Sequence, residues 1–148
     1  MTIFNDRLRQ CRKDKNLSQE YLADLLGVIP RSYRKYEGTD REPKITGLIA
    51  LAHCFEVSID YLVGRTDISR KPEKVNSRTQ AFSERLRTLR KLKGVRQKDV
   101  ADKLGMRERS FGLYEYGRRQ PRIAGLIALA DYFGVTVDCL VGVEDIPK

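Results

Sequence analysis

The sequence repeats itself. Shifting it by 78 residues aligns residues 4–68 with residues 82–146 without a gap, and 33 of the 65 aligned positions are identical. Self-similarity of this kind indicates a duplicated structural unit. The sequence therefore predicts two copies of one domain, residues 1–68 and 82–148. The segment between them, residues 69–81, is polar and basic and contains Pro72, which is typical of a linker between domains.

Apolar residues within each copy recur at helical spacing. Phe4, Leu8 and Cys11 follow the i, i+4, i+7 pattern of a helix with one buried face. Capping residues, glycines and prolines then divide the copy into further helices, expected at Gln19–Leu26, 30–37 and Ile45–Phe55, with a short fifth helix after Ser58. No segment alternates like a strand. The predicted fold class is all-α, with five helices in each copy.

The net charge of +9 arises from 29 Lys and Arg against 20 Asp and Glu. It grows along the chain, from +1 in residues 1–68 to +3 in residues 69–81 and +5 in residues 82–148. Such an excess fits either a solvated surface or a polyanionic partner such as nucleic acid. The apolar runs are too short to span a bilayer, and the N-terminal residues lack a signal-peptide pattern. A cytoplasmic protein with no membrane partner is expected.

Residues suited to metal binding or catalysis are scarce. Three cysteines lie far apart, and His53, the single histidine, aligns with Asp131 in the other copy. The sequence has no Gly-rich phosphate loop, nucleophile elbow or paired-carboxylate motif. We therefore expect no enzyme activity, no metal and no cofactor.

Two short helices joined by a glycine-containing turn are a helix-turn-helix signature. Several motif elements accompany them in both copies: Leu-Arg at 8–9 and 86–87, a Gln that opens the second helix, Ala-x-x-Leu-Gly at the turn, and Tyr-Glu at the end of the third helix. Over nearly their whole length, both copies resemble the phage-repressor/Cro-like, or xenobiotic-response-element, helix-turn-helix family. The resemblance implies two tandem lambda-repressor-like domains of a DNA-binding regulator, with the third helix in the major groove.

The resemblance also implies candidate contacts with double-stranded DNA. The predicted base-reading residues lie on the outer face of the third helix of each copy: Arg31, Ser32, Arg34, Lys35, Arg107, Glu108, Arg109, Ser110 and Leu113. The predicted phosphate contacts are the Gln at the start of each second helix and the cations toward the fourth helix: Gln19, Arg41, Lys44, Gln97, Arg118, Arg119 and Arg122.

Other prominent residues are expected to be structural. Arg12 with Glu37, and Arg90 with Glu115, match the family's partly buried ion pair between the first and third helices. Aromatic side chains at core spacing are expected inside: Tyr33, Tyr36, Phe55, Phe111, Tyr114 and Phe133.

The third helices depart from the family pattern. Ile29 and Arg107 precede them where a Ser or Thr cap is usual, at a cost of ~1 kcal/mol each. Gly112 lies inside the second of these helices, at a further ~1 kcal/mol relative to Ala, and Leu113 replaces the Lys35 of the first copy. Leu113 fits either a thymine methyl group or a protein partner.

Three functions remain open at this point. The leading one is a sequence-specific transcription regulator, expected to be a repressor, whose two domains bind one DNA or whose whole chain forms a homodimer. The second is a protein-interaction module or antitoxin-like adaptor, in which the C-terminal domain binds a protein partner. The third is an RNA-binding or nonspecific nucleic-acid protein.

Overall fold

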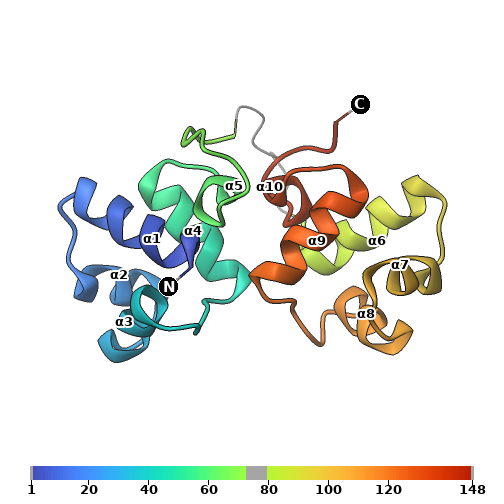
Figure 1. Cartoon of the computed structure of the whole chain (residues 1–148), viewed down its shortest axis with the longest axis horizontal. Coiled ribbons are helices and arrows are strands. Elements are labelled where there is room, and N and C mark those ends of the chain that lie inside the picture. The colour runs from blue at the N-terminus through green and yellow to red at the C-terminus, as the bar shows by residue number, and fades with distance from the viewer. Residues whose placement is uncertain (1, 73–79, 148) are drawn as a thin grey trace. The chain divides into compact units, whose positions relative to one another are not determined.

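The computed structural model describes residues 2–72 and 80–147. The chain divides into two compact units: unit 1 ends at Pro72 and unit 2 begins at residue 73. The described residues form ten helices, five in each unit, together with one isolated bridge (Figure 1). The all-α fold class predicted from the repeat is confirmed.

Unit 1 contains α1 (Ile3–Asp14), α2 (Gln19–Leu26), α3 (Pro30–Gly38), α4 (Ile45–Phe55) and α5 (Ile59–Leu62). Local sequence signals fix most of these ends. Ser18 caps α2 by accepting a hydrogen bond from the N–H of Tyr21, and Ser58 caps α5 in the same way. The α2 helix ends at Gly27, whose φ of 67° is the left-handed conformation that glycine adopts without strain.

Unit 2 repeats this order with α6 (Phe82–Lys93), α7 (Gln97–Leu104), α8 (Glu108–Glu115), α9 (Ile123–Phe133) and α10 (Val137–Leu140). Gly105 ends α7 with the same φ of 67°, and Thr136 caps α10. As expected, neither Ile29 nor Arg107 provides a side-chain cap for the helix that follows.

Each unit is organised around its own apolar core. In unit 1, α3 packs against α1 and α2, and α4 packs against α2 and α5. In unit 2, α8 packs against α6 and α7, and α9 packs against α6 and α10. Tyr33 and Phe111, at matching positions, are fully buried. Tyr114 and Phe133, also expected in the core, are half-buried.

Parts of the predicted linker, residues 69–81, are attached to the units. Arg70 forms an isolated antiparallel bridge with Val57, and Gln80 accepts a hydrogen bond from Arg85. The carbonyl oxygen of Gln80 also lies against Gly142, where an added Cβ would stand only 2.1 Å from it. Residues 73–79 of the predicted linker lie outside the described residues.

Candidate nucleic-acid interface

Two helices joined by a sharp turn form the centre of each unit. In unit 1, Leu22 and Ala23 on α2 and Tyr33 on α3 are buried, and Gly27 turns the chain between the two helices. In unit 2, Val100 and Ala101 on α7 and Phe111 on α8 are buried at the matching positions. Since one face of α3 and of α8 is buried in the core, the opposite face of each helix is turned toward solvent.

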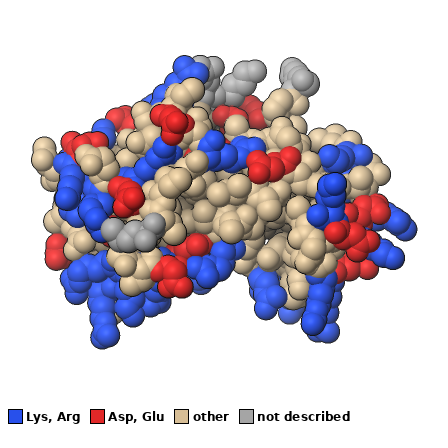
Figure 2. Space-filling model, viewed as in Figure 1, with Lys and Arg blue, Asp and Glu red and all other residues tan. Residues whose placement is uncertain are grey.

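The residues predicted to read bases lie on α3 and α8, except Arg107, which immediately precedes α8. Arg31 and Arg34 on α3 are exposed, and Ser32 and Lys35 are half-buried. In unit 2, the exposed members are Arg107, Glu108 and Arg109, and the half-buried ones are Ser110 and Leu113. Figure 2 shows Lys and Arg side chains gathered over the region of α3 in unit 1 and over the region of α8 in unit 2.

The predicted phosphate contacts lie beside these faces. Five cations between the third and fourth helices of the units are exposed: Arg41, Lys44, Arg118, Arg119 and Arg122. Lys44 and Arg122 are the N-cap residues of α4 and α9, so they immediately precede these helices. The structure therefore provides exposed positive charge on the loops that flank both outward faces.

An ion pair ties α3 to α1. The Arg12 guanidinium donates from Nε to Glu37 Oε2 at 2.7 Å and from Nη2 to Glu37 Oε1 at 3.1 Å. Only 3% of the Glu37 side chain is exposed. Arg9 also donates to the Glu37 main-chain carbonyl at 3.1 Å. These contacts hold the C-terminal end of α3 at a fixed angle to α1.

Gln19 is joined to the same carboxylate. Its Nε2 donates to Glu37 Oε1 at 3.3 Å, and in unit 2 the Nε2 of Gln97 donates to Glu115 Oε1 at 3.0 Å. This bond uses one of the two amide hydrogens, which leaves a donor and the carbonyl oxygen of each half-buried side chain for another partner. Phosphate binding by the two glutamines remains a prediction.

The pKa of Glu37 reflects these neighbours. Burial by itself raises the pKa of this carboxyl, but the hydrogen bonds from Arg12 and its other polar neighbours outweigh burial and hold the pKa below its usual value. The same pairing raises the pKa of Arg12. Glu37 is therefore ionised at neutral pH.

Unit 2 contains the same ion pair between its first and third helices. Arg90 donates to Glu115 from Nε at 2.6 Å and from Nη2 at 3.0 Å, and Arg87 donates to the Glu115 carbonyl at 3.3 Å. The Glu115 side chain is fully buried. The second half of the chain thus retains the contacts that orient its outward helix.

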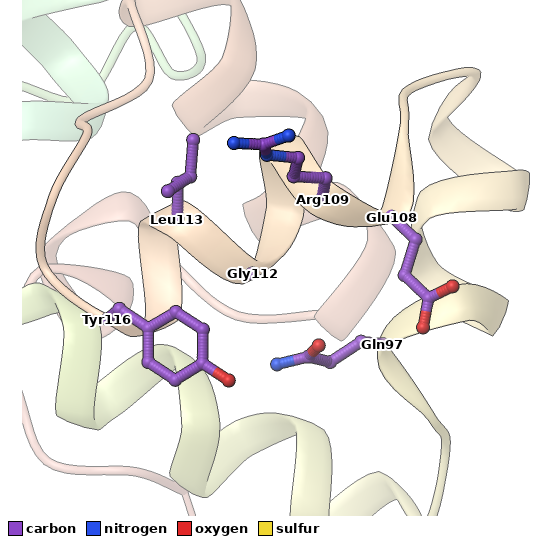
Figure 3. A pocket seen from close by; sticks show the side chains of 6 residues that line it. All are labelled: Gln97, Glu108, Arg109, Gly112, Leu113 and Tyr116. Carbon is purple, nitrogen blue, oxygen red and sulfur yellow. The ribbon is translucent and has the colours of Figure 1, made fainter.

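The outward face of α8 carries an open hollow of about 430 Å³. Its lining residues surround Gly112: Gln97, Glu108, Arg109, Leu113 and Tyr116 (Figure 3). In Figure 3 the Tyr116 hydroxyl and the Gln97 amide point toward each other on one side of Gly112, and Leu113 and Arg109 project on the other side. Sequence reasoning identified Gly112 and Leu113 but missed Tyr116, because its side chain joins the site only through the folded geometry.

The structural roles of two further pairs of arginines were missed, although one pair, Arg9 and Arg87, belongs to the Leu-Arg motif of both copies. Arg7 donates to the carbonyls of Tyr61 and Thr66, and Arg85 donates to those of Cys139 and Glu144, so each ties the first helix of its unit to the segment around the last. Arg9 and Arg87 hold the third helix, as described above. The available signal was identity between the copies at both positions.

Comparison with known families supports the helix-turn-helix geometry. A family model described as helix-turn-helix matches residues 8–62, and one described as a helix-turn-helix domain matches residues 81–140. Both units are helix-turn-helix domains of the phage-repressor/Cro-like family. The family resemblance predicted from the repeat is therefore confirmed for both helix-turn-helix domains.

Curated relatives of these helix-turn-helix domains are bacterial regulators. An uncharacterised HTH-type transcriptional regulator, YobD of Bacillus subtilis, is 40% identical over 65 residues, which cover 44% of this chain and 58% of the relative. The HTH-type transcriptional regulator AnsR of Bacillus subtilis is 45% identical over 60 residues, 40% of this chain and 52% of the relative.

A third relative carries a more specific name. The cryptic phage CTXphi transcriptional repressor RstR of Vibrio cholerae is 39% identical over 62 residues, 42% of this chain and 55% of the relative. The chain thus spans about half the length of the curated relatives it matches. The comparison with solved structures found no match. No helix in the described residues is long and apolar enough to cross a membrane.

Proposed function

We propose that this chain is a sequence-specific double-stranded DNA-binding protein that regulates transcription, with α3 and α8 as the helices that enter the major groove. The observation that carries the proposal is the orientation of these helices. Each buries Tyr33 or Phe111 in the core and is tied to the first helix by an ion pair, so that the face that carries Arg31 or Arg109 is held outward. A helix held rigidly outward, with side chains that can reach base edges, is what major-groove recognition requires.

The outward residues divide into two roles. Arg31 and Arg109, at the same position of the repeat, are the proposed base readers, since an Arg side chain makes bidentate hydrogen bonds to guanine. The loop cations are the proposed phosphate contacts, which add affinity without sequence preference. This division supports a regulator that finds a defined site rather than one that coats nucleic acid.

Repression is the proposed regulatory effect. It is supported by the similarity to RstR, which is named a transcriptional repressor. A protein bound at a specific site prevents other proteins from using that site, so repression needs no surface beyond the DNA-binding face.

Both units are proposed to bind one DNA. Half-sites one helical turn apart are separated by ~34 Å, and the chain between Arg70 and Gln80, which are attached to their own units, spans at most ~33–36 Å when fully extended. Tethering brings the local concentration of the second unit to roughly the millimolar range. Because the α3 and α8 faces differ, we expect an asymmetric composite site and not a perfect palindrome.

The proposal is tested by selecting sequences from a random duplex library with the purified full chain and then measuring affinity against salt. A conserved asymmetric motif and a steep fall in affinity between about 50 and 200 mM salt are expected, because several phosphates are neutralised. Recovery of no motif, with equal weak binding to random DNA and RNA, would contradict sequence-specific recognition.

A further inference from the structure

Three substitutions between the copies reshape the outward face of α8. Gly112 stands where unit 1 has Arg34, Leu113 stands where it has Lys35, and Tyr116 stands where it has Gly38. Two long cations are thus replaced by a residue without a side chain and by an apolar one, and an aromatic ring is added one residue after α8 ends. Arg109 is retained at the position of Arg31.

All three substituted residues line the hollow. A Cβ added to Gly112 would lie 3.5 Å from Gln97 Oε1 and 3.7 Å from Tyr116 Cε2, which are ordinary contact distances. A methyl group therefore fits at position 112, whereas a longer side chain would extend into the space between Leu113, Tyr116 and Gln97. Tyr116 is 66% exposed, so its ring forms an open wall of the hollow (Figure 3).

Charge around the hollow indicates a polyanion as the partner of this face. Arg109 and Glu108 line it with opposite charges, Arg107 precedes α8, and Arg118 with Arg119 follow Tyr116 after one residue. All five side chains are exposed, and the four cations outnumber the one carboxylate. The wall between these cations is apolar, because Leu113 and the Tyr116 ring form it. A phosphate gains nothing from such a wall, but an apolar group on a base edge does.

The major groove offers one such group. Among the four bases only thymine presents a methyl group there, and apolar side chains recognise it by contact. We propose that the hollow around Gly112 receives the 5-methyl group of a thymine, with Leu113 and Tyr116 as its walls, so that unit 2 requires a thymine beside the base pair contacted by Arg109. This inference rests on the proposed DNA binding and specifies what unit 2 recognises.

The test replaces each thymine of the selected duplex, one at a time, by deoxyuridine, which removes only the methyl group. For the unaltered full chain, one replacement is expected to weaken binding about fourfold. This ratio corresponds to the free energy gained by burying one methyl group. Leu113→Ala should bind the thymine duplex less tightly and lose the difference between thymine and deoxyuridine at that position. Gly112→Arg, which fills the hollow with the side chain found at position 34, should lose the same difference.

The matched control is Leu92→Ala. Leu92 is a leucine of the same unit that is 68% exposed on α6, so this variant should keep the full fourfold difference. The proposal is overturned if the chain binds its duplex but no deoxyuridine replacement matters, as expected if α8 serves a protein partner, or if the difference persists in Leu113→Ala and Gly112→Arg. Failure to bind any duplex would instead refute the proposed function itself.

Discussion

Arg90 and Glu115 are joined by two hydrogen bonds, of 2.6 and 3.0 Å, between an arginine side chain that is 16% exposed and a glutamate side chain that is completely buried. The pair connects α6 to the end of α8. Gln97 adds a third bond to the same carboxylate at 3.0 Å. The orientation of the outward helix of unit 2 therefore depends on a buried charge whose partners come from two other helices.

Removing one member of this pair should be costly. Arg90→Met leaves Glu115 buried with fewer partners, and we expect a loss of about 3 kcal/mol in the free energy of unfolding, measured by urea denaturation. Arg96→Met is the control, because Arg96 and Asp99 form an ion pair whose side chains are 78% and 38% exposed, and its loss should cost less than about 1 kcal/mol. Equal losses for the two variants would contradict a structural role for the buried pair.

Acid should weaken unit 1 through Glu37. Because the folded-state pKa of Glu37 is below its ordinary value of 4.5, the ionised carboxylate stabilises the fold above about that pH, and this contribution is lost as the pH falls through the folded-state pKa. In Glu37→Gln the free energy of unfolding should therefore change less with pH than in the unaltered chain. NMR signals of α1 and α3 report this unfolding.

Glu56→Gln provides the comparison for this titration. The pKa of Glu56 is also lowered, by its hydrogen bond with Lys15, but the side chain is 60% exposed, so solvent screens the pair. We expect Glu56→Gln to leave the pH dependence nearly unchanged. A Glu37 pKa at or above 4.5 in a direct NMR titration would be inconsistent with the described contacts.

Two helical glycines of unit 2 should respond oppositely to Ala. Gly112→Ala should stabilise the protein by about 0.5–1 kcal/mol, because the helix gains propensity and the new Cβ meets only ordinary contacts. Gly125→Ala should destabilise it, because the new Cβ would lie 2.9 Å from Pro121 Cβ. Thermal denaturation of the two variants decides between these signs, and a lower melting temperature for Gly112→Ala would mean that the hollow is not open as described.

Substitutions should distinguish the residues that read bases from those that contact phosphates. Arg31→Ala should cost about 1–3 kcal/mol on the selected duplex and relax the preference at one base pair, whereas Arg119→Ala should weaken binding to all duplexes about equally. Competition binding with selected and random DNA measures both effects. If Arg31→Ala weakens the two DNAs equally, Arg31 is a phosphate contact and not a base reader.

Much of the fold could be predicted because its signals are local. Ser18, Gly27 and Gly105 mark helix ends by their own conformational preferences, and the expected helices over Gln19–Leu26 and Ile45–Phe55 have the observed bounds. The third helix was expected over residues 30–37 and extends to Gly38, where the N–H of Thr39 still donates to the Lys35 carbonyl at 2.9 Å. Because glycine seldom continues a helix, its local preference did not predict that α3 ends at Gly38. Packing in the folded unit sets this end.

The candidate site was only partly predictable. The outward cations followed from the repeat and the family resemblance, but the hollow depends on Tyr116, which lies beyond the end of α8, and on Gln97, which comes from a different helix. The burial of Arg85 is similar, since its partners at Cys139 and Glu144 are more than fifty residues away in sequence. Contacts between distant segments leave no periodic pattern in the sequence.

Binding of one DNA by both units is tested by the affinities of four full-length proteins for the selected duplex: the unaltered chain, Arg31→Ala, Arg109→Ala and the double variant. Because each Arg is proposed to read a base in its own half-site, each single change should weaken binding roughly 5- to 150-fold. The losses should multiply in the double variant, since the two sites are independent. If Arg109→Ala binds as tightly as the unaltered chain, unit 2 does not read this DNA, and recognition of a composite site by two tandem domains is contradicted.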